Sequence, residues 1–189
     1  ESAAWLAEID DAGMLLGFRT LREPGWNSAF VTIEGTFDDY LASLTALTAG
    51  SLDGNSQTLN DTLVGISAGS DQVVVLVNDN SAGNDAIIVD ESINTIQDLA
   101  GKTVAAEPGV VDHFLLLQGL KDAGMTQDDI EFSGLATDAA AAAFAGGQFD
   151  CVGVFAPFTT QALARAGSHV LFSSKDHPGT ISDHFVATA

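Results

Sequence analysis

The segment SINTIQDLAGKTVAAEPGVVDHFLLLQGLKDAG, residues 92–124, decides the fold because helical and strand patterns alternate within it. It predicts a short helix stopped by Gly101, a strand TVAAE, and a longer helix that begins at Pro108–Gly109 and ends at Gly124. The strands IEFSGL, FDCVGVF and HVLFSS follow, separated by the helical patterns TDAAAAAFAGG and FTTQALARAG. This order, helix then strand four times over, predicts a parallel sheet with helices on both faces.

The part of the chain before residue 92 predicts a less regular arrangement. Apolar residues at helical spacing predict a helix over 36–50, and a second short helix is expected from Leu59. The runs VVVLV (73–77) and AIIV (86–89) are expected to be buried strands, because they are short and β-branched.

The composition also changes near Asp90–Glu91, and this change predicts two lobes. We expect residues 1–91 to form part of a first lobe and residues 92–178 a second α/β lobe. Residues 179–189 would return to the first lobe as a strand, so that a hinge and a cleft separate the lobes.

The charge balance excludes some partners. Twenty-six acidic residues face six basic ones, for a formal net charge of −20, so nucleic acid and anionic membrane surfaces would be repelled. The acids are spread along the whole chain, which favours a surface adapted to salt. An acidic cleft for a cation and ordinary sequence drift remain open alternatives.

Motifs for catalysis or metal binding are missing from the sequence. The lone Cys151 lies in an apolar run and is expected to be a small buried residue, and the four histidines show no metal-ligand spacing. There is no G-x-S-x-G, H-E-x-x-H or P-loop pattern, and NDNSAG lacks the later glutamate of a calcium loop. We therefore expect neither an enzyme nor a bound cofactor or metal.

Several longer stretches resemble a known family. These are SLTALTAGSLDGNSQTLND, SINTIQDLAGKTVAAEPG, DAAAAAFAGGQFDCVGVFAPF and SDHFVATA, and they cover most of the chain from Thr36 onward. They resemble the solute-binding proteins of ABC importers, in the nitrate, sulfonate and taurine group related to NMT1/THI5. The combination of SQTLND, VNDNSAGND and VDHFLLLQGL looks like the subgroup associated with urea carboxylase.

The resemblance implies an α/β fold of the type II periplasmic-binding-protein class. Each lobe would hold a mostly parallel sheet flanked by helices, and hinge strands would join the lobes. Family members extend beyond the positions of Trp5 and Ala189, so the resemblance implies a chain incomplete at both ends. It also implies a monomer outside the cytoplasmic membrane, either free or anchored there through a missing N-terminus, that passes a small solute to an ABC permease.

The polar loop NDNSAGND (78–85) and the helix start PGVVDHF supply candidate ligand contacts. In anion-binding relatives this helix start offers a serine or threonine beside free N–H groups, whereas here Asp112 occupies the first turn. A carboxylate in that place favours a cation if it faces the cleft; the alternative is an acid that only stabilises the helix. The loop residues in turn could cap their own backbone.

Two further stretches complete the predicted site. SQTLND stands at a helix start, where capping is the alternative role, and FAPF follows a strand and could stack on a planar ligand or pack in the core. The predicted ligand-contacting residues are Gln57, Thr58, Asp61, Asp79, Ser81, Asp85, Asp112, His113, Phe155 and Pro157.

These residues favour a guanidinium- or urea-like solute, because carboxylate and amide oxygens accept its N–H donors. A small oxyanion such as a sulfonate, taurine, nitrate or bicarbonate is the alternative ligand. A ligand-sensing or interaction domain on the same scaffold is a further alternative function.

Overall fold

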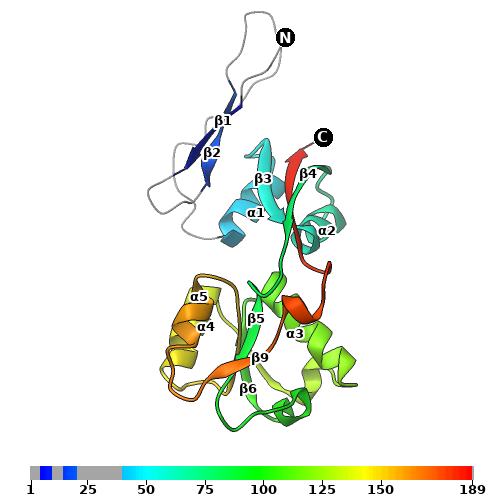
Figure 1. Ribbon diagram of the computed structural model, residues 1–189. Helices are drawn as coiled ribbons and strands as arrows, with labels where there is room; N and C mark the ends of the chain where they lie inside the picture. The colour runs from blue at the N-terminus through cyan, green and yellow to red at the C-terminus, as the bar shows by residue number, and fades with distance from the viewer. Residues whose placement is uncertain (1–4, 10–14, 21–39, 189) are drawn as a thin grey trace, which may run out of the picture.

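The computed structural model describes residues 5–9, 15–20 and 40–188, which contain three β-sheets (Figure 1). One of these is an antiparallel pair of β1 (Trp5–Ile9) and β2 (Leu15–Thr20). The beginning of the helix expected over 36–50 and the final residue of the expected return strand, Ala189, lie outside the described residues. Within those residues, no helix combines the length and the apolar character needed to cross a bilayer.

The larger sheet has five strands in the order β7-β6-β8-β5-β9. Strand β6 (Thr103–Ala106) runs parallel to β7 (Glu131–Gly134) and to β8 (Cys151–Val154). Strand β5 (Ala86–Val89) lies antiparallel to both β8 and β9 (His169–Ser173), so β8 and β9 point the same way. The parallel direction expected for the strands after residue 93 is therefore correct, but β5 enters between them and makes the sheet mixed.

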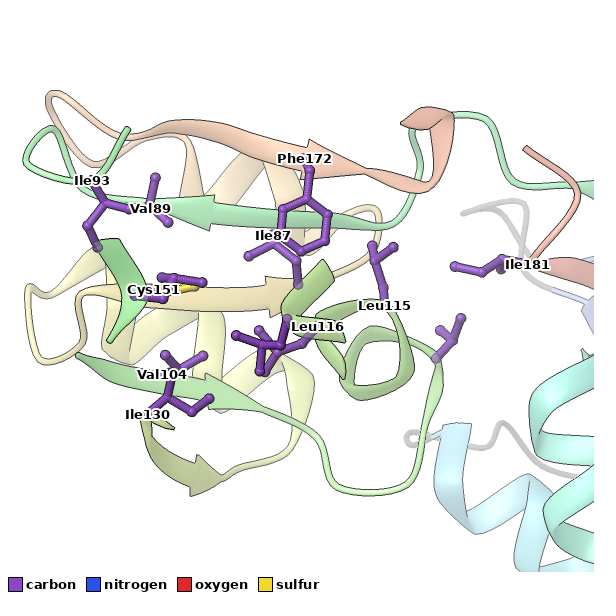
Figure 2. Close-up of a cluster of buried hydrophobic side chains, with 13 residues drawn as sticks. Ile87, Val89, Ile93, Val104, Leu115, Leu116, Ile130, Cys151, Phe172 and Ile181 are labelled. Atoms are coloured by element: carbon purple, nitrogen blue, oxygen red, sulfur yellow. The ribbon is translucent and has the colours of Figure 1, made fainter. Parts of the chain in front are cut away.

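Both faces of this sheet are covered. Within β5, Ile87 and Val89 belong to the cluster on the α3 face, while Ala86 and Ile88 belong to the cluster on the α4 face. Figure 2 shows Leu116 of α3 beside Ile87 and Cys151 on neighbouring strands. This double coverage explains the uninterrupted apolar run of β5.

The helical segments of the chain between β5 and β10 are η1 (Ile96–Leu99), α3 (Val111–Asp122), η2 (Gln127–Asp129), α4 (Thr137–Ala145), α5 (Phe158–Ala162) and η3 (Ser174–Asp176).

The smaller sheet has three strands in the order β3-β10-β4 and is antiparallel throughout. The expectation of a mostly parallel sheet in each lobe is wrong here, because β10 (Ser182–Thr188) arrives from the other sheet and inserts between β3 (Gly54–Thr58) and β4 (Gln72–Asn80) in the opposite direction. Helices α1 (Tyr40–Thr48) and α2 (Leu59–Ser67) pack against this sheet.

Strand β4 corrects a second expectation. Its VVVLV segment was expected to be buried, yet those five side chains are 39–61% exposed. Among the described residues β4 pairs only with β10, so it is an edge strand. At its first residue, Gln72 packs under α2, where a side chain on Gly65 would meet its amide.

By sheet membership, the chain crosses from the smaller sheet to the larger one between Asn80 and Ala86, and returns between Ser173 and Ser182. The boundary expected at residue 91 thus comes after β5, whose hydrogen bonds lie in the five-stranded sheet. In Figure 1 the two connecting segments run between the upper and the lower group of elements.

Candidate functional site

The loop between β4 and β5 is a crossing between sheets and not a hairpin turn. Its Ser81 hydroxyl donates to the Asp85 carboxylate and lies 2.7 Å from the hydroxyl of Ser174, on the second connecting segment. The Ser174 hydroxyl also accepts the Gly83 N–H at 2.8 Å, and the Ser81 N–H donates to the Ile181 carbonyl at 2.8 Å. The loop's hydrogen-bonding groups therefore tie the two connecting segments together.

Two predicted ligand contacts, Ser81 and Asp85, belong to this cluster. Both side chains are buried, at 8% and 3% exposed. Burial raises the pKa of Asp85, the hydrogen bond from Ser81 lowers it, and the charge of Asp79 raises it further. The side chains of Ser81 and Asp85 are thus bonded to each other and, through Ser81, to Ser174 on the second connecting segment.

At the start of α2, two of the predicted residues have partners within their own lobe. The Gln57 side-chain amide donates to the Thr62 hydroxyl at 2.9 Å and to the Gln72 side chain at 3.1 Å. Thr58 is the N-cap of α2, and its hydroxyl accepts the Asp61 N–H at 3.2 Å. Both side chains therefore stabilise the smaller lobe and leave Asp61 as the charged group at this helix start.

Asp61 is held by Tyr40, a residue that sequence reasoning did not select. The Tyr40 hydroxyl donates to Asp61 Oδ2 at 2.7 Å and accepts the Thr58 N–H at 3.1 Å. Asp61 Oδ1 is buried and has no hydrogen-bond partner among the described residues. Burial raises the pKa of Asp61, and the hydrogen bonds from Tyr40 and Thr58 partly oppose that rise. Tyr40 lies 21 positions before Asp61, so no local pattern links the two.

Asp112, in the first turn of α3, is fully buried. Its Oδ2 accepts the Glu107 N–H at 3.3 Å, while its Oδ1 has no partner among the described residues. Burial raises the pKa of Asp112 to about 7, and the neighbouring charge of Glu107 contributes to the rise. Such a carboxylate is costly to keep ionised without a ligand or proton, so its burial marks a candidate site.

Glu107 is an acid near Asp112 that the sequence analysis did not select. Its carboxylate accepts the N–H of Thr137 at 2.9 Å and the Thr137 hydroxyl at 2.7 Å. Helix α4 begins at Thr137, with Ala136 as its N-cap. The Thr137 hydroxyl donates to Glu107 and makes no capping bond to its own helix.

Carboxylates lie at the N-termini of three helices. Asp61 and Asp112 are first-turn residues of α2 and α3, and Glu107 accepts the Thr137 N–H at the start of α4. The helix dipole favours an acid in such a place, and the charge of the acid opposes the binding of an anion at the same helix start. The charges of Glu107 in the larger lobe and of Asp85 in the connection both add to the rise in the pKa of Asp61.

The predicted contact Asp79 lies exposed on β4, opposite Asp183 of β10. The pKa of Asp183 is raised to about 6, first by burial and then by the charge of Asp79. Asp183 was not selected from the sequence, because only the pairing of β10 with β4 brings the two acids together.

His113 is engaged within the larger lobe. Its Nδ1 accepts the Gly109 N–H at 3.1 Å, its Nε2 lies 2.7 Å from the Gln127 side chain, and its ring stacks on Phe132 with centroids 4.7 Å apart. Through these contacts, the His113 side chain holds the loop before α3 in place.

The aromatic residue Phe155 lies between the lobes. Its ring meets Tyr40 edge to face at 6.4 Å and Phe158 at 5.9 Å. Pro157 is exposed and follows Ala156 through a cis peptide bond, directly before α5. The structure therefore brings Asp61 and Phe155 together through Tyr40. Across the described part of the chain, no group of three or more His, Cys, Asp or Glu residues is arranged to hold a metal ion.

Comparison with known proteins identifies the family of this chain. A sequence profile described as NMT1/THI5 like matches residues 38–187, which is most of its length. The chain belongs to the NMT1/THI5-like family. This confirms the resemblance at the level of the family, whereas the relatives give no support to the subgroup associated with urea carboxylase.

This NMT1/THI5-like chain is 34% identical over 146 residues to a putative aliphatic sulfonates-binding protein of Escherichia coli strain K12, covering 76% of this chain and 46% of that protein. Among solved structures, the periplasmic aliphatic sulphonate binding protein SsuA of E. coli is 32% identical, with a TM-score of 0.70 over 80% of this chain and 53% of that one. SsuA of Xanthomonas axonopodis pv. citri bound to MOPS is 26% identical, with the same TM-score and coverage.

The NMT1/THI5-like chain therefore spans about half the length of the relatives it matches. The match confirms the periplasmic-binding-protein fold predicted from the sequence. The relatives are named for solute binding and not for a reaction, in agreement with the expectation that the chain is not an enzyme.

Proposed function

We propose that this chain forms part of the solute-binding component of an ABC importer, which captures a small polar solute outside the cytoplasmic membrane and delivers it to a membrane permease. The observation that carries the proposal is the contact between the lobes at Tyr40, which bonds to Asp61 in the smaller lobe and meets the ring of Phe155 from the larger lobe, in a family whose relatives bind solutes. A solute that contacts both lobes stabilises the closed arrangement, because the open one cannot make both sets of contacts. We further propose that the component acts as a monomer and binds no nucleic acid.

A small oxyanion, an aliphatic sulfonate first, is the ligand class that the relatives favour. Both the E. coli and the X. axonopodis proteins are named as sulfonate-binding proteins, and the identity to the E. coli protein reaches 34%. On this hypothesis, groups other than the acids described above neutralise the charge of the anion.

A guanidinium- or urea-like solute is the second candidate, and a specific observation favours it. Asp61 and Asp112 each keep one buried carboxylate oxygen without a partner among the described residues, and N–H donors of a solute would satisfy both. In addition, carboxylates lie at the N-termini of α2, α3 and α4, where their charge would repel an anion.

Titration calorimetry on the full chain tests the function and separates the two ligand classes. The probes are ethanesulfonate, taurine, guanidinium and urea, each titrated into the natural protein and into Asp112→Asn. For a cation, the variant should weaken binding of guanidinium about tenfold or more, through loss of a charge-assisted contact. For an oxyanion, the same variant should bind ethanesulfonate as well as or better than the natural protein.

Small-angle scattering with and without the bound probe supplies the second readout, because closure reduces the radius of gyration. A protein that binds none of the four probes and shows no compaction would speak against solute capture. It would favour the alternative of an interaction or sensor domain on this scaffold.

A further inference from the structure

The two oxygens of the Asp61 carboxylate are treated unequally. Oδ2 accepts two hydroxyl donors, from Tyr40 and from Thr58, each at 2.7 Å. Oδ1 is buried, in a side chain only 5% exposed, and has no partner among the described residues. Because an ionised carboxylate accepts hydrogen bonds on both oxygens, the bare oxygen is the one that a donor from outside could meet.

The hydrogen-bond directions around Tyr40 leave no freedom for its proton. Its hydroxyl accepts the Thr58 N–H at 3.1 Å, so its single proton is given to Asp61 Oδ2. The Thr58 hydroxyl behaves likewise, since it accepts the Asp61 N–H and donates to the same oxygen. Burial and the charge of Asp61 raise the pKa of Tyr40, which keeps the phenol protonated as a donor.

Tyr40 also touches the other lobe. Its ring meets the ring of Phe155 edge to face, with an interplanar angle of 70°, and Phe155 directly follows strand β8 of the five-stranded sheet. The phenol on α1 therefore contacts the acid of α2 through its hydroxyl and the larger lobe through its ring. A change in the separation of the lobes would alter this ring contact beside the Asp61 carboxylate.

We propose that Tyr40 is a positioning residue of the solute site: it holds Asp61 Oδ2, so that Oδ1 is the oxygen presented to the solute. This inference rests on the proposed function, since it assigns a role within the same site. Tyr40 acts through Asp61, and the Phe155 ring fixes the position of the phenol when the lobes meet.

The test replaces Tyr40 by phenylalanine, which removes the hydroxyl and keeps the ring that meets Phe155. Thr45→Val is the matched control, because it removes a hydroxyl from the same helix that serves only the Leu41 carbonyl at an exposed position. The first readout is the pKa of Asp61, followed by carbon NMR of its carboxyl group. Tyr40→Phe should raise that pKa, since the lost hydrogen bond lowers it, and Thr45→Val should leave it unchanged.

The second readout is the binding of guanidinium and of ethanesulfonate by calorimetry between pH 5 and pH 8. If guanidinium binds the natural protein, Tyr40→Phe should weaken it about tenfold at pH 7 and move the pH midpoint of binding upward. If ethanesulfonate binds instead, the same variant should strengthen it, because a protonated Asp61 becomes a donor. A side chain that only fills space would not move the pH midpoint of either probe.

The outcomes separate the two proposals. Binding by the natural protein, with an Asp61 pKa and a pH midpoint in Tyr40→Phe equal to those of Thr45→Val, would overturn the role of Tyr40 and leave the solute-binding function standing. No binding of any probe, together with a raised Asp61 pKa in Tyr40→Phe, would remove the function and retain the hold of Tyr40 on the carboxylate. Loss of both results would remove both proposals.

Discussion

Two apolar strands of similar composition, VVVLV in β4 and AIIV in β5, have opposite environments. The four residues of β5 are at most 2% exposed, whereas the five in β4 are 39–61% exposed. Strand β5 lies between β8 and β9 with helices on both faces, while β4 pairs only with β10 among the described residues. The difference teaches that β-branched composition predicts a strand, whereas neighbouring elements decide whether that strand is buried.

The same contrast extends to the lobes that hold these strands. The five-stranded sheet supports two large buried clusters, while the buried cluster of the smaller sheet consists of Leu47, Leu52 and Val186. In the larger lobe, Asp112 and Phe155 are therefore positioned by a well-packed apolar core. The smaller lobe positions Asp61 chiefly through hydrogen bonds from Tyr40 and Thr58.

The strongest test of this contrast is the same truncation in both strands. Ile88→Ala, at a fully buried position of β5, should lower the free energy of unfolding by about 2–5 kcal/mol, because it leaves a cavity. Leu76→Ala, at a position of β4 that is 60% exposed, should cost less than about 1 kcal/mol. Urea unfolding followed by circular dichroism measures both, and equal losses would mean that β4 is covered in solution.

A smaller effect is expected from the charge buried in the larger lobe. The pKa of Asp112 is raised from 3.8 to about 7, so its contribution favours folding at low pH and is lost as the pH rises through about 7. Asp112→Asn should therefore stabilise the protein by about 2 kcal/mol at pH 8 and have little effect near pH 4. The measurement is the urea midpoint at both pH values.

Asp138→Asn is the control for this variant, because Asp138 is a first-turn acid of α4 but is exposed. It should show no gain at pH 8. A gain as large as that of Asp112→Asn would attribute the effect to overall charge and not to burial.

The contrast also separates what could be read from the sequence from what could not. Local signals were sufficient for α3, with Pro108–Gly109 before it and Gly124 after it, and for the strand that became β8. The contacts of the candidate site join residues far apart in the chain, such as Tyr40 with Asp61 and Ser81 with Ser174, which are separated by 21 and 93 positions. No periodicity encodes such pairs, because they depend on which strands become neighbours.

A substitution in the connection between the lobes should lower the free energy of unfolding less than a truncation in the core. Ser174→Ala removes the hydroxyl that approaches Ser81 and accepts the Gly83 N–H, and it should cost about 1–2 kcal/mol by leaving buried groups without partners. Hydrogen exchange of the Gly83 amide should accelerate, since its acceptor is gone. Ser67→Ala, which removes an exposed hydroxyl bonded to the Val64 carbonyl, should change neither quantity.

The smallest expected effect lies at the end of β4, where an edge strand carries a like-charge pair. Asp79→Asn removes the charge opposite Asp183, so the pKa of Asp183 should fall from about 6 toward its usual value without reaching it, because burial is the larger cause of the rise. The raised pKa favours folding at low pH, so the variant should shift the associated loss of stability to lower pH. The change in unfolding free energy should be a few tenths of a kcal/mol, as for other cross-strand pairs. Carbon NMR of the Asp183 carboxyl group measures the shift, and an unchanged pKa would mean that the two carboxylates do not face each other in solution, so that β4 is loosely paired at this end.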